Sequence, residues 1–362
     1  MSSKNQYTPE TVTHPGMDLA EKLEELGMGP KELGIRMDKA EKEVIAMLKG
    51  ERAITPESAL RLEQVLRIPA HYWLKRQQTF DEAEARIARQ ELLAQAVVWM
   101  RKFPMASMVK LGWIPSESHG TEKALRLLEF FQLSSPNAWK QTYCDQQMKL
   151  AFRISLANTK EPFAISAWLR QGELLAQQTV VPQYDSTELK AALPKLKAIM
   201  AAHPVGFMTQ LQDTCARAGV IVVYTPTLPK APIGGCARWI KDNPLIQLSD
   251  RQKRNDVFWF NVFHELGHVL EHGKKDIFLE NIEYSEADAK KESEANAFAV
   301  KWTLTEPEEH EVSRDKPLSK TKVREYAERF GTHPGVIVGR LQRSGVLRKD
   351  VMTELFKSVR IQ

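Results

Sequence analysis

The stretch Phe260–His272 reads FNVFHELGHVLEH and contains the pattern His-Glu-x-x-His inside an apolar run. This pattern is typical of a zinc-dependent peptidase helix. On an α-helix, His264 and His268 lie one turn apart on the same side, so both imidazoles can reach one metal ion. Glu265 projects beside them, where it can hold a metal-bound water and accept its proton. The stretch therefore predicts two metal ligands and a general base on one buried helix.

A catalytic zinc normally takes three protein ligands and leaves one position for water, so a third ligand is expected downstream. The acidic residues within reach in the sequence are Glu280, Glu283, Glu286, Asp288, Glu292 and Glu294.

The pattern of residues 287–304 predicts one helix. The candidate ligands on it can be distinguished by whether each points toward the core or toward solvent. The expected core face carries Ala295, Phe298 and Trp302. At about 100° per residue, Glu292 falls within the buried sector and Glu294 points toward solvent. Asp288 also lands on the buried face. We predict Glu292 as the third ligand.

Three β-type stretches precede the His-Glu-x-x-His helix. They comprise Val220–Tyr224, Ile233–Ile240 and Leu245–Ser249, separated by proline and asparagine turns. Zinc peptidases commonly place a small sheet ahead of this helix, and an edge strand of such a sheet can bind substrate by strand addition. The alternative is that the two histidines are core or surface residues that bind no metal. The β-type stretches ahead of the helix disfavour it.

Composition is that of an ordinary soluble globular protein, with 362 residues, 43% hydrophobic and 27% charged. No run of eighteen apolar residues is present, so we expect no membrane partner. The polar segment 1–15 lacks the apolar core of a secretory signal. The cysteines Cys144, Cys215 and Cys236 are widely spaced and odd in number, which suits a reducing cytoplasm.

The segment from Gly16 to about residue 75 predicts several short helices. Leu19, Leu23 and Leu26 repeat at helical spacing, and a second helix is expected over Pro30–Met37. Asp38 is expected to cap a third helix. Thr55-Pro56 is an N-terminal signal for a fourth helix, with Leu60 on its apolar side, and Pro69 opens a fifth. This spacing predicts a compact helix-turn-helix bundle.

Gly50–Leu62, followed by Tyr72-Trp73-Leu74, resembles the Xre-type helix-turn-helix of host-inhibition-of-growth antitoxins. The resemblance implies that the helix before Gly50 enters the DNA major groove. The residues predicted to contact DNA are Lys39, Ala40, Lys42, Lys49 and Arg52.

Two glutamates weigh against DNA binding by this module. Glu41 and Glu43 stand on the predicted recognition helix, and acidic and basic residues are about equal over residues 1–80. Phosphate neutralisation supplies much of DNA affinity, so a single module is a poor electrostatic match. A homodimer recovers part of that affinity, and a protein-binding bundle is the alternative.

Glu292–Ala299 resembles the Glu-x-x-Ala-Asn-x-Phe-Ala element of ImmA/IrrE metallopeptidases, which supplies their third ligand. Gln247–Ser249, Asp256–Phe260 and His333–Gln342 also match that family's pattern. The two resemblances together extend from about Gly16 to about Leu355. They imply one Zn²⁺ per chain, bound by His264, His268 and Glu292.

Further residues are candidates for supporting roles. Asn296, one turn beyond Glu292, is expected to orient a ligand. His272 is too far along the helix to share the metal, and capping is favoured over catalysis for it. Arg238, Tyr284 and His333 are weaker candidates for stabilising a transition state, and each is expected to be structural or exposed.

The predicted fold class is mainly α with a small β-sheet (α+β). We expect a disordered lead-in over 1–15, an Xre-type helix-turn-helix domain over 16–88, a helical spacer over 89–205 and a zincin-like metallopeptidase domain over 206–362.

The leading functional hypothesis is a cytoplasmic regulatory zinc metallo-endopeptidase that cleaves a partner protein, a repressor or other regulator, in stress or mobile-element control. The alternative is an antitoxin-like transcriptional regulator that binds DNA and a cognate toxin, with the zinc domain as sensor or platform.

Overall fold

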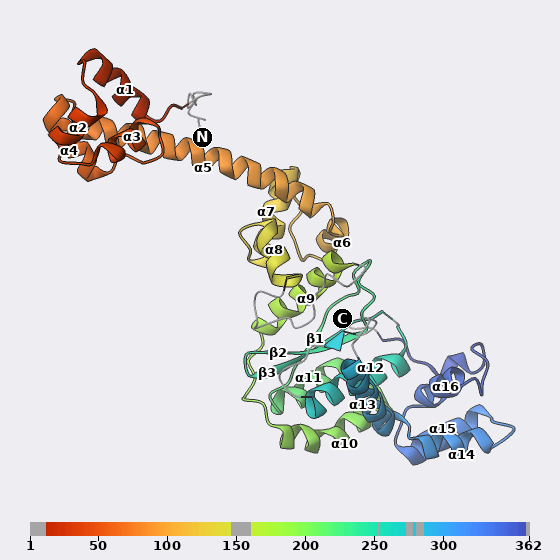
Figure 1. Cartoon of the computed structure of the whole chain (residues 1–362). Helices are drawn as coiled ribbons and strands as arrows, with labels where there is room; N and C mark the ends of the chain where they lie inside the picture. The colour runs from red at the N-terminus through yellow and green to blue at the C-terminus, as the bar shows by residue number, and fades with distance from the viewer. Residues whose placement is uncertain (1–11, 146–160, 252, 273–277, 280–285, 360–362) are drawn as a thin grey trace. The chain divides into compact units, whose positions relative to one another are not determined.

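The structure, a computed structural model, describes residues 12–145, 161–251, 253–272, 278–279 and 286–359 (Figure 1). The chain divides into two compact units, Met1–Gln95 and Ala96–Gln362. Helices dominate and one small sheet is present, so the predicted α+β class is confirmed. The predicted domain limits at residues 15, 88 and 205 stay predictions. Within the described part of the chain, no helix combines the length and apolarity that a membrane crossing requires.

The first unit is a bundle of short helices around one apolar core. Its helices are α1 (Pro15–Glu25), α2 (Pro30–Met37), α3 (Glu41–Leu48), α4 (Pro56–Leu66) and the start of α5 (Ala70–Met100). The predicted cap at Thr55 is present, since its hydroxyl accepts a hydrogen bond from the Ser58 N–H. Leu19, Leu33 and Trp73 are fully buried in the core.

Two expectations for this unit are wrong. Asp38 does not cap α3: it ends α2 in the left-handed region, with φ of 51°, and Ala40 is the N-cap residue of α3. Aspartate tolerates that conformation better than most residues, so it can end the helix there. Leu26 and Leu60, expected on apolar faces, are 49% and 58% exposed.

The second unit begins with helices that enclose a cluster of aromatic side chains. They are α6 (Met105–Lys110), α7 (Gly120–Phe131), α8 (Pro136–Tyr143) and α9 (Pro162–Gln177). The Trp139 ring stacks on Phe163 at 4.6 Å and meets Phe103 edge to face at 5.8 Å. This packing of large apolar rings holds α6–α9 together.

The sheet has the strand order β1-β3-β2-β4. Its strands are β1 (Ile221–Tyr224), β2 (Gly235–Ile240), β3 (Asn243–Leu248) and β4 (Phe278–Leu279). β1 and β3 are parallel, whereas β2 is antiparallel to both of its neighbours. The three predicted strands are confirmed, and β4 was not predicted because two residues carry no periodicity.

The sheet is covered on both faces by helices. Ile221, Val223 and Leu245 pack with Ala176 of α9, whereas Val222 and Ile246 belong to the main core on the opposite face. That core also contains residues of α10 (Ser186–Ala202), α11 (Phe207–Arg217) and α12 (Asn255–Glu271). Because side chains alternate along a strand, each strand contributes to both cores.

The chain ends in helices that pack beside α12. They are α13 (Glu286–Thr303), α14 (Glu306–Arg314), α15 (Lys320–Phe330) and α16 (Pro334–Arg343), followed by the 3₁₀ turn η3 (Thr353–Leu355). In Figure 1, α12 and α13 lie side by side beneath the sheet, and their contact is the most extensive between any two elements described. The predicted helix over 287–304 is confirmed.

Two buried histidines lie in the core of the second unit. His203 Nδ1 accepts a hydrogen bond from Trp259 Nε1 at 3.0 Å, and the His203 and His333 rings are 6.0 Å apart. Burial lowers the pKa of each imidazole from 6.5 to about 4. Both rings are therefore neutral in the folded protein at pH 7.

This burial predicts a loss of stability in weak acid. The unfolded chain binds protons at these histidines below pH 6.5 and the folded chain only near pH 4, so stability falls as pH drops through that window. His203 alone accounts for about 2 kcal/mol at pH 5. Urea unfolding at pH 7 and pH 5 measures the loss.

His203→Asn is the matched variant, because its amide oxygen takes the place of Nδ1 and asparagine tolerates the φ of 40° at this position. We expect the variant to lose less stability than the wild type between pH 7 and pH 5. Equal losses in both proteins would contradict the assignment to His203.

Candidate functional site

The helix α12 carries three ionisable side chains into the core of the second unit. His264 is 8% exposed, and Glu265 and His268 are each 2% exposed. The apolar residues Phe263, Leu266 and Val269 bury the rest of this helix against the sheet and α13. Ionisable groups at such depth require partners, because an isolated buried charge is costly.

Glu292 of α13 meets the two histidines of α12. The Nε2 atoms of His264 and His268 are 3.0 Å apart, and the Glu292 carboxylate oxygens lie 3.3 Å from His264 Nε2 and 3.4 Å from His268 Nε2. One donor atom from each residue lies within 4.8 Å of the other two. The structure thus brings together the three predicted ligands.

The donor set fits a zinc ion. Two imidazole nitrogens and one carboxylate oxygen form the three-ligand set of a catalytic zinc with an open position. Among the described residues, Glu292 Oε1 is buried without a hydrogen bond. The two Nε2 atoms are 3.0 Å apart and both face the Glu292 carboxylate, so all three groups converge on one point. A shared divalent cation satisfies all three groups.

The electrostatics of the cluster keep its ligands in the forms that bind metal. Burial lowers the pKa of His268 to about 4, so this imidazole is neutral at pH 7. Burial alone would raise the pKa of Glu292, but contacts with His264 and His268 outweigh it and lower the pKa to about 2. A neutral imidazole and an ionised carboxylate are the forms in which these side chains coordinate a metal.

Asn296 holds the outer nitrogen of His264. Its side-chain oxygen lies 3.1 Å from His264 Nδ1, and an amide oxygen can only accept, so Nδ1 carries the proton. The neutral ring then has its lone pair on Nε2, toward Glu292 and His268. This geometry agrees with the orienting role predicted for Asn296.

His272 is the C-cap residue of α12, in agreement with the capping role favoured for it, but its ring is not at the surface. Its side chain is 4% exposed, and its Nδ1 lies 3.0 Å from His268 Nδ1. Its Nε2 lies 3.0 Å from a Glu294 carboxylate oxygen. The predicted direction of Glu294, toward solvent, agrees with its 47% exposed side chain, yet that side chain still reaches the histidine.

Gly235, the first residue of β2, lies against the Glu265 side chain and leaves space for it. A Cβ atom at this glycine would lie 2.6 Å from Glu265 Oε1 and 3.0 Å from its Cγ. Sequence reasoning missed Gly235, although Gly234-Gly235 within the predicted strand was a signal that the backbone there approaches something closely. A side chain at this position would therefore force the end of the Glu265 side chain to move.

The remaining residues predicted as ligands or transition-state donors have other partners or lie outside the residues that the structure describes. Arg238 donates hydrogen bonds to Glu173 of α9 and to Gln247 of β3. His333 caps α16. Glu280, Glu283 and Tyr284 lie outside the described residues, as do the side chains of Glu286 and Asp288.

Residues 215–342 match the family model described as the IrrE N-terminal-like domain, Peptidase_M78. This part of the chain is therefore similar to the IrrE N-terminal-like domain. The IrrE-like domain contains the sheet strands β1–β3 and all three members of the His-His-Glu cluster. The predicted resemblance to the ImmA/IrrE family is confirmed, and the match points to a metallopeptidase-type domain.

Solved antitoxin structures resemble the N-terminal part of the chain. One is an addiction module antidote protein of the HigA family from Coxiella burnetii, with 32% identity over 22% of this chain and 88% of that chain, and a TM-score of 0.22. Another is the Pseudomonas aeruginosa antitoxin HigA with the higBA promoter, with 26% identity over 22% of this chain and 89% of that chain, and a TM-score of 0.22. No curated protein matches the chain.

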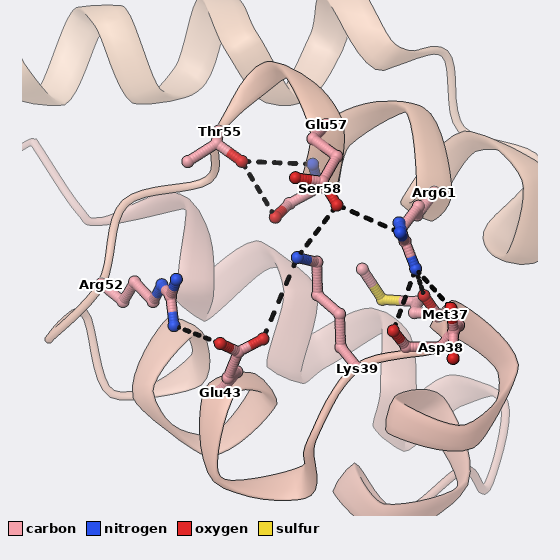
Figure 2. A network of polar contacts seen from close by, with 9 residues as sticks. All are labelled: Met37, Asp38, Lys39, Glu43, Arg52, Thr55, Glu57, Ser58 and Arg61. Carbon is pink, nitrogen blue, oxygen red and sulfur yellow. Dashed lines mark hydrogen bonds and ion pairs between the residues drawn. The ribbon is translucent and has the colours of Figure 1, made fainter.

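Two of the five residues predicted to contact DNA are engaged by carboxylates of the same unit. Figure 2 shows Lys39 between Glu43 and Glu57, with Nζ 3.9 Å and 3.4 Å from their oxygens. Arg52 pairs with Glu43 at 2.7 Å. The Lys39 side chain is only 13% exposed, so it offers little to a phosphate. Ala40, Lys42 and Lys49 are exposed.

Arg61 extends the same network to the turn between α2 and α3. It donates to the Asp38 carbonyl at 2.9 Å and also pairs with Glu57 at 3.1 Å (Figure 2). Glu43 and Glu57 therefore compete with any external phosphate for the cations of this surface. We call this set, Asp38, Lys39, Glu43, Arg52, Glu57 and Arg61, the charge network.

The charge network predicts that removing Glu43 strengthens binding to nucleic acid. Glu43→Gln releases Arg52 and loosens Lys39, so affinity for a random-sequence duplex of about 24 base pairs should rise several-fold at about 50 mM salt. Fluorescence anisotropy at about 50 and 200 mM salt measures the affinity and its salt dependence.

Glu41→Gln is the matched control, because Glu41 is exposed on the same helix and lies outside the charge network. It changes net charge equally without releasing Arg52. If both variants gain the same affinity, net charge alone explains the effect and the competition by Glu43 is refuted.

Proposed function

We propose that the chain is a cytoplasmic regulatory zinc metallo-endopeptidase that cleaves a partner protein and is coupled to a helix-turn-helix unit. The observation that supports this most directly is the convergence of His264, His268 and Glu292 with the Glu265 carboxylate one residue from the first ligand. A structural histidine pair would not need a buried glutamate held against Gly235.

The chemistry follows from the residues around the cluster. A zinc ion, when bound there, supplies a Lewis acid that polarises a peptide carbonyl and lowers the pKa of water. Glu265 has no part in the three-ligand set, so its carboxylate is available to accept a proton from the attacking water and to pass it to the leaving amine. Gly235 holds β2 close to this carboxylate and so restricts where it can lie.

The fold supports limited cleavage of a folded or partly folded partner, rather than digestion. The three predicted ligands lie on the packed helices α12 and α13. The two on α12, His264 and His268, are 8% and 2% exposed. A substrate segment must therefore be extended to reach the ligands, and it would lie beside the sheet. We propose a repressor or other regulator as the substrate class.

The second candidate is a regulator that binds DNA and a cognate toxin, with the IrrE-like domain as sensor or platform. The exposed cations Lys42 and Lys49 at the two ends of α3 favour it. The charge network disfavours tight DNA binding, because Glu43 and Glu57 already neutralise part of the same surface.

The proposed activity predicts cleavage products that depend on Glu265. We expect cells that express the wild type to contain one or a few new protein N-termini that are absent with Glu265→Gln, because the amide cannot accept the proton of water. Proteome-wide labelling of N-termini measures this, with Glu271→Gln, an exposed position on the same helix, as the matched control.

Gly235→Ala provides a second variant. The added methyl must displace the end of the Glu265 side chain, at little cost to folding, so cleavage should fall about 10-fold or more while metal content is retained. New N-termini that persist unchanged with Glu265→Gln would refute the proposed peptidase activity.

A further inference from the structure

We propose that His272 and Glu294 form a positioning pair that fixes the proton of His268 and thereby strengthens zinc binding. The inference rests on the proposed metal site and adds two residues to it. Neither residue touches the metal position. His272 acts through a hydrogen bond to Nδ1 of His268, the ring nitrogen that faces away from the other ligands, and Glu294 acts through His272.

The contacts form a continuous chain from the surface to the ligand. The Glu294 carboxylate, half exposed on α13, lies 3.0 Å from His272 Nε2. His272 Nδ1 lies 3.0 Å from His268 Nδ1, and His268 Nε2 faces Glu292 at 3.4 Å. The His272 ring is nearly fully covered, so water does not freely replace either contact.

When both imidazoles carry a single proton, these contacts allow one arrangement of protons along the chain. A carboxylate only accepts, so His272 Nε2 must donate to Glu294. The Nδ1 atom of His272 then has a lone pair and must accept the hydrogen bond from His268 Nδ1. This leaves the lone pair of His268 on Nε2, the atom that faces the other two ligands.

The helix α13 thus supplies one ligand and an anchor for each of the other two. Glu292 coordinates, Asn296 accepts from His264, and Glu294 acts on His268 through His272. A hydrogen bond that orients a ligand histidine typically contributes 10- to 100-fold to metal affinity. The pair is therefore expected to tune how tightly the site holds zinc.

The test is the zinc dissociation constant of the full-length protein, measured by competition with a chromogenic chelator. His272→Leu removes the acceptor, and zinc affinity should fall about 10- to 100-fold. His272→Asn places an amide oxygen where Nδ1 lies, so its affinity should stay within about three-fold of the wild type. A residue that only fills space would tolerate leucine at least as well as asparagine.

Glu294→Ala tests the outer contact without disturbing the core, and Glu271→Ala is its matched control, since both remove one exposed glutamate near the end of α12. Affinity should fall in Glu294→Ala and not in Glu271→Ala. The visible spectrum of the Co²⁺-substituted proteins should change in His272→Leu and be restored in His272→Asn, because it reports ligand orientation.

The outcomes separate this inference from the proposed function. A wild type that binds no zinc overturns both. A wild type that binds zinc, with His272→Leu equally tight or His272→Asn as weak as His272→Leu, overturns the positioning pair and leaves the metal site intact.

Discussion

The close contact between α12 and α13 is the constraint on which the His-His-Glu cluster depends. At Gly267, an added Cβ atom would lie 3.1 Å from Phe298 Cβ and 3.3 Å from Ala295 Cα, so glycine at this position lets the helices approach closely without crowding. The approach brings Glu292 to the two histidines. It also buries the three side chains, and buried ionisable groups need partners, which here are one another.

Much of this site could be predicted from the sequence, because helical periodicity carries the information. The five-residue spacing placed His264 and His268 on one side, and the core face of residues 287–304 favoured Glu292 and Asp288 over Glu294. The position of Asn296 followed from the same spacing. Each of these inferences needs only one helix and the direction of its core.

The features that could not be predicted arise where two elements meet. Glu294 points to solvent on its own helix, yet it contacts a histidine at the end of another. Gly235 matters because of a glutamate on a helix that follows much later. Asp38 looks like a helix cap but ends the preceding helix, since aspartate suits both positions and only the turn geometry decides. Such pairings require the fold, not a pattern along the chain.

The same physical idea, a carboxylate that fixes a cationic or proton-donating partner, serves different ends in the two units. In the first unit, Glu43 and Glu57 neutralise lysine and arginine and so weaken the surface for phosphate. In the second, Glu292 and Glu294 hold histidines in the form that coordinates metal.

Elemental analysis of the purified protein tests the central claim most directly. The account predicts about one zinc per chain for the wild type, with zinc lost or much reduced in both His264→Ala and Glu292→Ala. A wild type that contains no zinc after supplementation, or variants that retain it fully, would contradict the three-ligand site.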